Sequence, residues 1–431
     1  MTILERAKEA RKASFTLATL SSEIKNRALE AMASALESNK DDIIRANQED
    51  YERSVKENLA GPLLKRLKFD SEKISQVIEG VRSLISMPDP VGETLMATQL
   101  EPGLELYRIS CPIGVTGIIF ESRPDALVQI SSLCLKSGNA LLLKGGSEAS
   151  ETNRILTRII NESTVAAGLP YGWIQLVQTR DDVNEMFSMN EYIDLLIPRG
   201  SNAFVKYIME HSSIPVLGHS DGICHIYIHE DADTAMVIPI VVDSKTQYVA
   251  ACNTVETLLV HQDIASRVLP GLKKALEEQK VDLVGCDRCR EIIDIVPATE
   301  IDWATEYVDY KLSIKIVNSL DEAIEHINYY GSGHTDAILT EAKKTASVFM
   351  SRVDASSVLW NCSTRFSDGF RYGFGAEIGI STSKIHARGP VGMEGLMIYK
   401  YKLLGSGQLV SQFSSGEKKF THESLDDKCP L

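Results

Sequence analysis

Apolar residues recur at three- and four-residue steps through the first part of the chain, up to about residue 86. After Asp70-Ser71 they fall on one face of a predicted helix, at Ile74, Val77, Ile78, Val81, Leu84 and Ile85. Asp70-Ser71 is a favourable N-cap for this helix, and Pro88 and Pro90 follow its end. The pattern predicts a layer of helices whose apolar faces cover another part of the molecule.

The spacing changes to short alternating segments between about residues 97 and 112. These segments flank the turn signal Glu101-Pro102-Gly103, which predicts a β-hairpin. A hairpin on its own cannot bury its faces. We therefore expect it to pair with another subunit.

Two blocks of short apolar runs separated by helical segments follow. In residues 113–245, strands are expected at Ile113–Phe120, Ala140–Lys144, Ile174–Val177, Ile193–Ile197 and Ile223–Ile228. In residues 254–362, strands are expected at Thr254–Val260, Val281–Val284, Ser313–Val317, Asp336–Thr340 and Ser356–Trp360. This alternation predicts an α/β fold with two parallel-type sheets, each covered by helices. We expect a ligand site in a cleft between the two units.

The end of the chain is rich in glycine and polar residues from Asn361 onward. These segments are predicted to be ordered loops that line the cleft. A last strand at Leu396–Leu403 is expected before a polar tail.

Composition narrows the range of partners. The 431 residues carry a net charge of −14, so the surface repels the phosphates of nucleic acid, although a local basic pocket for an anionic substrate remains possible. The eight cysteines are too sparse and irregular for a disulfide framework, which indicates a reducing compartment. No apolar run approaches the roughly 20 residues of a membrane helix. We expect a cytoplasmic protein without a membrane or nucleic-acid partner.

Cys252 is the leading candidate for chemistry. It follows Ala250-Ala251, precedes Asn253 and stands directly before a predicted buried strand. A thiolate at such a position is a good nucleophile for a carbonyl carbon. Most free cysteines, however, pack as small apolar residues, and this one residue leaves both interpretations open.

Two strand ends are candidate phosphate-binding turns. Lys144-Gly-Gly-Ser147 and Pro198-Arg-Gly-Ser201 each end a predicted strand and open a helix, where backbone N–H groups favour an anion. The chain contains neither the dinucleotide-binding G-x-G-x-x-G pattern after a strand nor a P-loop. Ordinary turns that use glycine for its conformational freedom are the alternative.

Several cationic or potentially cationic side chains lie in segments of the expected cleft. They are Arg123, Arg365, His386 and Arg388. An arginine at a strand end can hold a phosphate or an oxyanion, and an exposed salt bridge is the alternative. Together these groups suggest an anionic substrate.

No metal site is expected. Cys286-Asp-Arg-Cys289 is a lone C-x-x-C without a second pair, which favours neither zinc nor a redox role. His211, His219, His225 and His229 lack the spacing of metal ligands.

Seven motifs in order along the chain resemble the γ-glutamyl phosphate reductase family, also called glutamate-5-semialdehyde dehydrogenases, of the aldehyde dehydrogenase superfamily. They are Glu121-Ser-Arg-Pro, Pro198-Arg-Gly-Ser, Val216-Leu-Gly-His-Ser-Asp-Gly-Ile-Cys, the Cys252 segment, His334-Thr-Asp-Ala-Ile, Asn361-x-Ser-Thr-Arg-Phe-Ser-Asp-Gly and His386-Ala-Arg-Gly-Pro-Val-Gly.

The resemblance implies three structural parts. They are an NADP-binding domain (1–96 and 113–245), a catalytic domain (246–382), and an oligomerisation flap with the C-terminal segment (97–112 and 383–431). The flap implies a homo-oligomer.

The resemblance also implies residue roles. Cys252 is the nucleophile, Lys144 lies near the adenosine ribose, Gly200 and Ser201 open the helix that faces the pyrophosphate, and Glu306 holds the nicotinamide ribose. At lower specificity, the substrate or phosphate contacts fall on Asn361, Arg365, His386 and Arg388.

Departures from the wider superfamily refine the expected chemistry. Val216 stands where aldehyde-oxidising members place a glutamate that activates water, so a thioester here would wait for hydride. Arg123 replaces an oxyanion asparagine and could bind the acyl phosphate or the oxyanion. Ser147 replaces the glutamate typical of members that prefer NAD, which favours NADPH by removing a repulsive charge.

The implied reaction is the NADPH-dependent reduction of L-glutamyl 5-phosphate to L-glutamate 5-semialdehyde and phosphate, the second step of proline biosynthesis from glutamate. Two alternatives remain: phosphate-independent aldehyde oxidation, and a non-catalytic interaction protein on the same fold. A glutamate 5-kinase is a possible partner.

Overall fold

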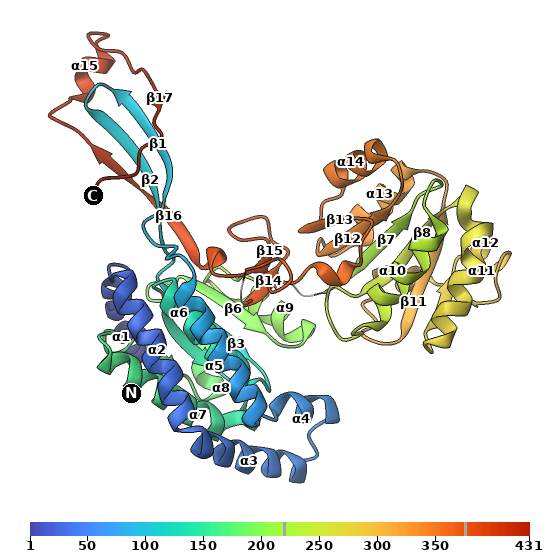
Figure 1. Ribbon diagram of the computed structural model, residues 1–431, viewed down its shortest axis with the longest axis horizontal. Helices are drawn as coiled ribbons and strands as arrows, with labels where there is room; N and C mark the ends of the chain where they lie inside the picture. Colours follow the sequence, from blue (N-terminus) through green and yellow to red (C-terminus); the bar gives the residue numbers. More distant parts are fainter. Residues whose placement is uncertain (219–220, 375–376) are drawn as a thin grey trace.

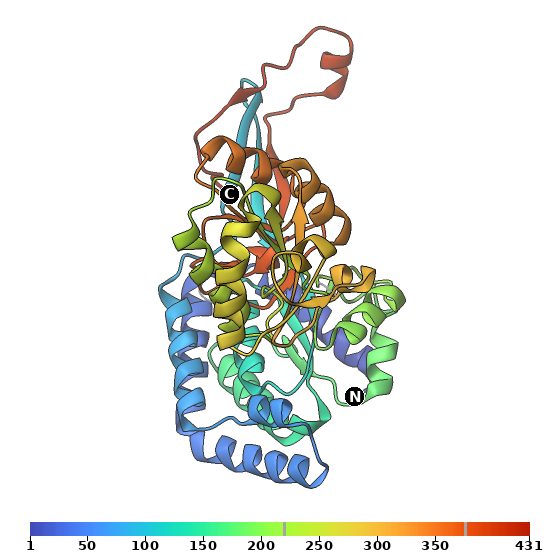
Figure 2. The ribbon, with the colours of Figure 1, turned by 90° about the vertical axis from the view of Figure 1, so that its right-hand side faces the viewer.

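The computed structural model describes residues 1–218, 221–374 and 377–431. Figure 1 shows an N-terminal α/β unit, a second α/β unit beside it and a slender sheet that projects away from both. The view turned by 90° shows the same projection above the two units (Figure 2). No helix among the described residues has the length and apolar character needed to cross a membrane.

The helical layer predicted for the N-terminus is present. It comprises α1 (Ile3–Leu17), α2 (Ser22–Ser38), α3 (Lys40–Lys56), α4 (Gly61–Leu67) and α5 (Ser71–Ser86). The carboxylate of Asp70 caps α5 by accepting the backbone N–H of Lys73 at 3.1 Å. The apolar face of α5 is buried in the core of the first unit, so the helix pattern in the sequence is confirmed.

The first sheet has four parallel strands in the order β5-β4-β3-β6. The strands are β3 (Val115–Phe120), β4 (Ala140–Lys144), β5 (Ile174–Leu176) and β6 (Leu195–Arg199). The helices that alternate with them are α6 (Pro124–Lys136), α7 (Ser150–Ala166), α8 (Arg180–Met186) and α9 (Asn202–His211), with a 3₁₀ turn η1 (Ser147–Ala149). Every residue of β3 is buried, as expected for a central parallel strand.

The second sheet has seven strands in the order β10-β9-β11-β8-β7-β12-β13, all parallel. They are β7 (Cys224–Ile228), β8 (Val255–His261), β9 (Asp282–Gly285), β10 (Val296–Pro297), β11 (Lys311–Val317), β12 (Thr335–Leu339) and β13 (Ser357–Trp360). The sequence pattern had grouped β7 with the first block. That grouping was wrong, because β7 pairs with β8 and β12.

The helices of the second unit are α10 (Thr234–Thr246), α11 (Gln262–Glu278), α12 (Asp287–Arg290), α13 (Leu320–Tyr330) and α14 (Lys343–Arg352). Two 3₁₀ turns accompany them, η2 (Glu300–Ala304) and η3 (Thr364–Phe366). The sequence analysis did not predict α10. Its apolar residues form no one-sided stripe, and Pro239 lies inside it, so the helical period is hidden.

The projecting flap is a four-stranded antiparallel sheet in the order β16-β2-β1-β17. It contains β1 (Thr94–Glu101), β2 (Leu104–Pro112), β16 (Met397–Leu404) and β17 (Glu423–Ser424). The predicted hairpin and last strand are confirmed, and Gly103 provides the positive φ of +81° at the turn. The tail after β16 is not wholly irregular, since it adds β17 and α15 (Val410–Ser414). The hairpin therefore pairs first with strands of its own chain.

A smaller ribbon connects the second unit to the flap. It consists of β14 (Gly379–Ser381) and β15 (Gly389–Val391), which pair antiparallel, and the 3₁₀ turn η4 (Glu394–Leu396). Ile378, Val391 and Leu396 are buried in the core of the first unit. The chain thus returns to the first unit before it enters the flap.

Candidate active site

Cys252 lies in the turn that leads into β8. Three hydrogen bonds fix this turn: Asn253 Nδ2 donates to the carbonyl of Ser367 at 2.8 Å, Thr254 Oγ1 donates to the carbonyl of Tyr248 at 2.8 Å, and Cys224 Sγ donates to the Cys252 carbonyl at 3.2 Å. The thiol is therefore held by a turn with little freedom to move.

His334 is the polar side chain in contact with this thiol. Its Nε2 lies 3.1 Å from Cys252 Sγ, and its Nδ1 lies 2.8 Å from the hydroxyl of Thr335. The side chain is fully buried at the start of β12. In the tautomer that donates from Nδ1 to Thr335, Nε2 is free of a proton and can accept the one on sulfur. The sequence analysis used the His334 motif but gave the residue no role.

The electrostatic environment keeps the free thiol protonated. Burial raises the pKa of Cys252 to about 12, and the negative charges of Glu377 and Glu306 act in the same direction. The positive charge of Arg365 lowers this pKa, but by less. Formation of the nucleophile at neutral pH therefore requires a base beside the sulfur.

Glu306 brings the two units together near Cys252. Asn202, the first residue of α9, donates a short hydrogen bond from Nδ2 to Glu306 Oε2. Gly222 lies between Cys252 and Glu306. A Cβ at this position would stand 2.3 Å from the Cys252 carbonyl oxygen and 2.6 Å from Glu306 Oε1. Only a residue without a side chain fits this space.

Arg199, at the end of β6, is a further cation near the thiol. Its Nη2 lies 3.9 Å from Glu377 Oε1, and its Nη1 donates to the Glu377 carbonyl at 3.5 Å. Burial lowers the pKa of Arg199, and the charge of Arg123 lowers it further, whereas Glu377 and Cys252 raise it. The sequence analysis included Arg199 in a motif without naming it as a site residue. Glu377 was not named as a site residue, although it lies in one of the glycine-rich segments predicted to line the cleft.

Arg123 stands at the N-cap position of α6, and its guanidinium lies 3.8 Å from Asp125. The preceding residue, Ser122, has a φ of +44°, an unusual value for a residue with a side chain. The side chain of Arg123 is 44% exposed, and its ion pair with Asp125 is long. The guanidinium is therefore accessible to an anionic ligand.

The loop after β4 carries the residues assigned to the cofactor's ribose. Lys144 Nζ donates to the carbonyl of Gly145 at 2.5 Å, and the carboxylate of Glu148 accepts both the backbone N–H and the hydroxyl of Ser122. Arg53 of α3 donates to the carbonyl of Ser147 at 3.1 Å. The loop is thus anchored to the helical layer.

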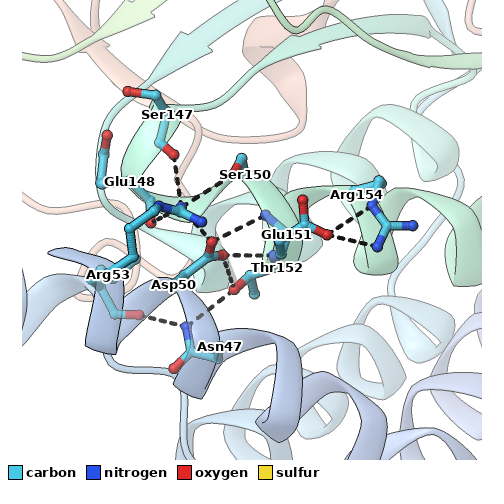
Figure 3. A network of polar contacts seen from close by, with 10 residues as sticks. Asn47, Asp50, Arg53, Ser147, Glu148, Ser150, Glu151, Thr152 and Arg154 are labelled. Atoms are coloured by element: carbon cyan, nitrogen blue, oxygen red, sulfur yellow. Dashed lines mark hydrogen bonds and ion pairs between the residues drawn. The ribbon is translucent and has the colours of Figure 1, made fainter.

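Figure 3 shows the network beneath this loop. The buried carboxylate of Asp50 accepts the backbone N–H of Thr152 at 2.8 Å, its hydroxyl at 2.7 Å and the backbone N–H of Glu151 at 3.2 Å. Arg53 pairs with Asp50 at 2.6 Å and also contacts Ser150 Oγ at 3.1 Å. Asp50 therefore caps α7 from another helix.

The four remaining predicted contact residues have structural partners in this state. Asn361 forms two hydrogen bonds with the backbone of Thr340. Its Oδ1 accepts the Thr340 N–H at 3.0 Å, and its Nδ2 donates to the Thr340 carbonyl at 2.9 Å. Arg365 is buried and donates from Nε to Gln247 Oε1 at 3.0 Å. Arg365 is the member of this set whose charge acts on Cys252.

His386 and Arg388 lie together on the connecting ribbon. His386 Nε2 is 2.7 Å from the carbonyl of Gly395, and Arg388 forms an ion pair with Asp354 at 3.0 Å. Arg388, but not His386, lines a cavity of about 390 Å³ together with Met393 and Phe374. His219, which the sequence analysis considered, lies outside the described residues.

The residues present fit a nicotinamide dinucleotide. The ten-residue helix α9 begins with no side-chain cap among the described residues, and the N-terminus of a helix favours an anion. The Glu121 carboxylate is hydrogen bonded to the backbone N–H of Ser201 at this helix start. Burial and the charge of Glu148 raise the pKa of Glu121, and the Ser201 N–H offsets only part of this rise. A Cβ on Gly200 would approach the Phe204 ring to 3.0 Å and Glu121 Oε2 to 3.2 Å, so glycine allows the turn to pack closely against both side chains.

Comparison with known proteins connects this geometry to a family. The model of the aldehyde dehydrogenase family matches residues 2–297. The γ-glutamyl phosphate reductase of Acetivibrio thermocellus is 64% identical over 431 residues, which are 100% of each chain. The enzyme of the same name from Pelotomaculum thermopropionicum is 62% identical over 99% of this chain and 98% of its own. The crystal structure of γ-glutamyl phosphate reductase from Thermotoga maritima is 40% identical, covers 95% of this chain and 100% of its own, and superposes with a TM-score of 0.93.

Proposed function

Because this chain belongs to the γ-glutamyl phosphate reductases of the aldehyde dehydrogenase family, we propose that it reduces L-glutamyl 5-phosphate to L-glutamate 5-semialdehyde and phosphate through a thioester on Cys252. This is the second step of proline biosynthesis from glutamate. The observation that carries the proposal is the 3.1 Å contact between Cys252 Sγ and His334 Nε2 inside a buried site with several cations.

His334 begins the reaction by accepting the thiol proton. Since burial raises the pKa of Cys252 to about 12, the proton moves as the sulfur attacks rather than beforehand. The sulfur bonds to the acyl carbon, the bond to the phosphate oxygen breaks, and inorganic phosphate leaves. The acyl group then remains on Cys252 as a thioester.

The cations around the thiol bind the anionic substrate and stabilise charge that develops during attack. Arg199 and Arg365 both interact electrostatically with the Cys252 sulfur, and Arg123 acts on Arg199. A guanidinium binds phosphate with two parallel hydrogen bonds. We assign Arg123 to the phosphate or the oxyanion, and Arg365 to the substrate. We also propose substrate contacts for three further residues, Asn361, His386 and Arg388. Their side chains already bind the protein's own backbone or Asp354, so they must give up these partners to bind substrate.

A nicotinamide cofactor supplies the hydride when it is bound. Glu306, beside Cys252, would hold the nicotinamide end of this cofactor, and the β4 loop with Lys144 and Ser147 would hold the adenosine end. After reduction the thiohemiacetal on Cys252 collapses, the C–S bond breaks, and the sulfur regains its proton from His334. The aldehyde leaves and the free thiol is restored.

We propose NADPH rather than NADH. Ser147 contributes no negative charge at the position where NAD-preferring relatives carry a glutamate, and Lys144 is close enough to affect the pKa of Glu121 at the same end of the sheet. The neighbouring Glu148 is hydrogen bonded to Ser122, which directs its carboxylate toward the end of β3. These charges suit a 2′-phosphate.

Val216 supports reduction over hydrolysis. It is a half-buried apolar residue beside β6 that packs against the core of the first unit. An aliphatic side chain cannot activate water. A thioester on Cys252 is therefore protected until hydride arrives.

The proposal is tested in the reverse direction. The assay measures NADP⁺ reduction with glutamate 5-semialdehyde, with and without inorganic phosphate, for the natural chain, Cys252→Ala and His334→Asn. We expect turnover that requires phosphate, none detectable in Cys252→Ala and a loss of about 100- to 10,000-fold in His334→Asn.

Each alternative gives a different result. Equal turnover without phosphate identifies a hydrolytic aldehyde dehydrogenase. Full activity of Cys252→Ala removes the assigned nucleophile, and no activity with any aldehyde indicates a binding protein on the same fold. We further propose a cytoplasmic homo-oligomer that associates through the flap, with a glutamate 5-kinase as a candidate partner that delivers the labile acyl phosphate.

A further inference from the structure

A pair of thiols lies in the second unit, apart from the reaction described above. Cys286 is the N-cap residue of α12, and Cys289 lies one turn later within it. Their sulfur atoms are 3.5 Å apart. Cys289 is fully buried, whereas Cys286 is partly exposed. The Cys286 thiol is therefore accessible to small reagents, and the Cys289 thiol is buried next to it.

The surrounding groups stabilise a thiolate on Cys286. Its sulfur accepts the backbone N–H of Ile316 at 3.4 Å and lies beside Cys289, which shares a hydrogen bond with it. Arg288 adds a positive charge nearby and is held in place by Asn318 at 2.7 Å and the Ile316 carbonyl. These effects, with the Cys289 thiol first among them, lower the pKa of Cys286 to about 5 and raise that of Cys289.

Five other thiols, including the catalytic one, lie in environments that disfavour a thiolate. Burial raises the pKa of Cys111, Cys134, Cys224, Cys252 and Cys362. At neutral pH Cys286 is therefore a thiolate while the catalytic thiol remains protonated. Thiolates, not thiols, react with peroxides.

Close packing against Gly285 fixes the position of the Cys289 side chain behind Cys286. A Cβ at position 285 would stand 3.0 Å from the Cβ of Cys289 and 2.5 Å from Ile295, so Gly285 provides the space that Cys289 occupies. An S–S bond is about 2.05 Å long, so the sulfurs must approach by roughly 1.5 Å. Two flexible χ1 angles at the start of a four-residue helix can supply that movement.

We propose that Cys286 and Cys289 form a reversible redox couple that hydroperoxides oxidise before they oxidise Cys252. The Cys286 thiolate attacks the peroxide, the O–O bond breaks, and Cys286 becomes a sulfenic acid as hydroxide or alkoxide leaves. The sulfur of Cys289 then attacks Cys286, expels water and closes the disulfide. The two thiols lose two electrons and the peroxide gains them. A low-molecular-weight dithiol restores the pair by exchange.

The Cys286–Cys289 pair and Cys252 lie at opposite ends of the strands of the second sheet. Cys286 follows the end of β9, and Gly285 pairs with Ile314 within β11, whereas Cys252 precedes the start of β8. The oxidation state of the pair is thus expected to leave catalysis intact. Because the Cys286–Cys289 pair consumes peroxide away from the active site, it protects Cys252 from oxidation.

The test exposes the intact protein at pH 7 to less than one equivalent of hydrogen peroxide and maps cysteine peptides by mass spectrometry. We expect an internal disulfide in the peptide with Cys286 and Cys289, a mass loss of two hydrogens that dithiothreitol reverses, and retained phosphate-dependent activity. Oxidation of Cys252 first, or no disulfide, overturns the proposal.

Two variants identify the order of events. Cys289→Ser is expected to stall at a Cys286 sulfenic acid that dimedone captures, while Cys286→Ser is expected to lose peroxide consumption by at least about tenfold and to lose Cys252 activity sooner. Cys111→Ser, a variant of a thiol outside the pair, is the matched control and should behave as the natural chain. Equal peroxide consumption in Cys286→Ser and the natural chain contradicts the assigned role of Cys286.

Discussion

At the scale of single residues, the absence of a side chain at Gly222 is as important as the side chains around Cys252. A Cβ at this position would lie closest to the carbonyl oxygen and the Cα of Cys252. These backbone atoms cannot shift without also moving the sulfur of the same residue. The site is therefore held by close backbone packing as well as by hydrogen bonds.

Gly222→Ala is expected to lower kcat/KM by about 100-fold, because a displacement near 1 Å at the reacting atom has an effect of this size. The added methyl group would stand 2.3 Å from the Cys252 carbonyl oxygen. Steady-state kinetics with phosphate and NADP⁺ measure the change. Gly80→Ala is the control, since a Cβ there meets nothing within 4 Å and lies on α5. Equal losses in both variants would show that the crowding at Gly222 is unimportant.

Residue roles could be predicted only in part from the sequence. Cys252 and Glu306 stand in motifs that resemble the family, and the structure brings their segments together at Gly222. His334 and Arg199 lie in such motifs too, but their nearness to the thiol depends on other strands: His334 precedes β12 of the same sheet as β8, and Arg199 ends β6 of the first unit. No local pattern reports that kind of contact.

At the scale of elements, the helix α7 depends on a cap supplied by α3. Asp50 precedes Glu151 and Thr152 by 101 and 102 residues, yet it satisfies N–H groups of the first turn of α7 (Figure 3). The β4 loop and the cofactor residues assigned to it are thereby tied to the N-terminal helices.

Asp50→Ala is expected to reduce the free energy of unfolding by about 2–4 kcal/mol, because it uncaps α7 and leaves Arg53 without its carboxylate. Urea denaturation followed by circular dichroism measures the change. Arg154→Ala removes a neighbouring but exposed ion pair with Glu151 and should change stability by less than about 0.5 kcal/mol. Similar values for the two variants would rule out a special role for Asp50.

Element positions were the most predictable part of the fold. Strand β4 begins and ends where its apolar run does, and Asp70 caps α5 as its side-chain chemistry requires. Pattern failed where apolar residues lie on every side of an element, as in α10, and where pairing joins distant segments, as in β7 and β17. Periodicity reports one buried face, and it carries no information about the partner.

At the scale of the whole molecule, the flap presents an apolar edge. Strand β16 is an outer strand of its sheet, and Tyr399, Tyr401 and Leu403 alternate along one face with exposed fractions of 46%, 56% and 56%. Such a patch on a projecting sheet is typical of a subunit interface.

Leu403→Glu is expected to shift the protein to a smaller oligomer, because a charge would be buried on association. Light scattering after size-exclusion chromatography measures the mass. Ile301→Glu, which alters an apolar residue of the second unit with a larger exposed fraction of 77%, should leave the mass unchanged. A monomeric natural chain, or an unchanged mass in Leu403→Glu, contradicts the proposed interface.

The flap is assembled from segments that are far apart in the chain. Translation produces β1 and β2 long before β16 and β17. Until then the edge of β2 that later pairs with β16 has open backbone groups, which invite strands from other chains. A nascent chain that stalls before β16 is therefore prone to aggregate even after its first unit has folded.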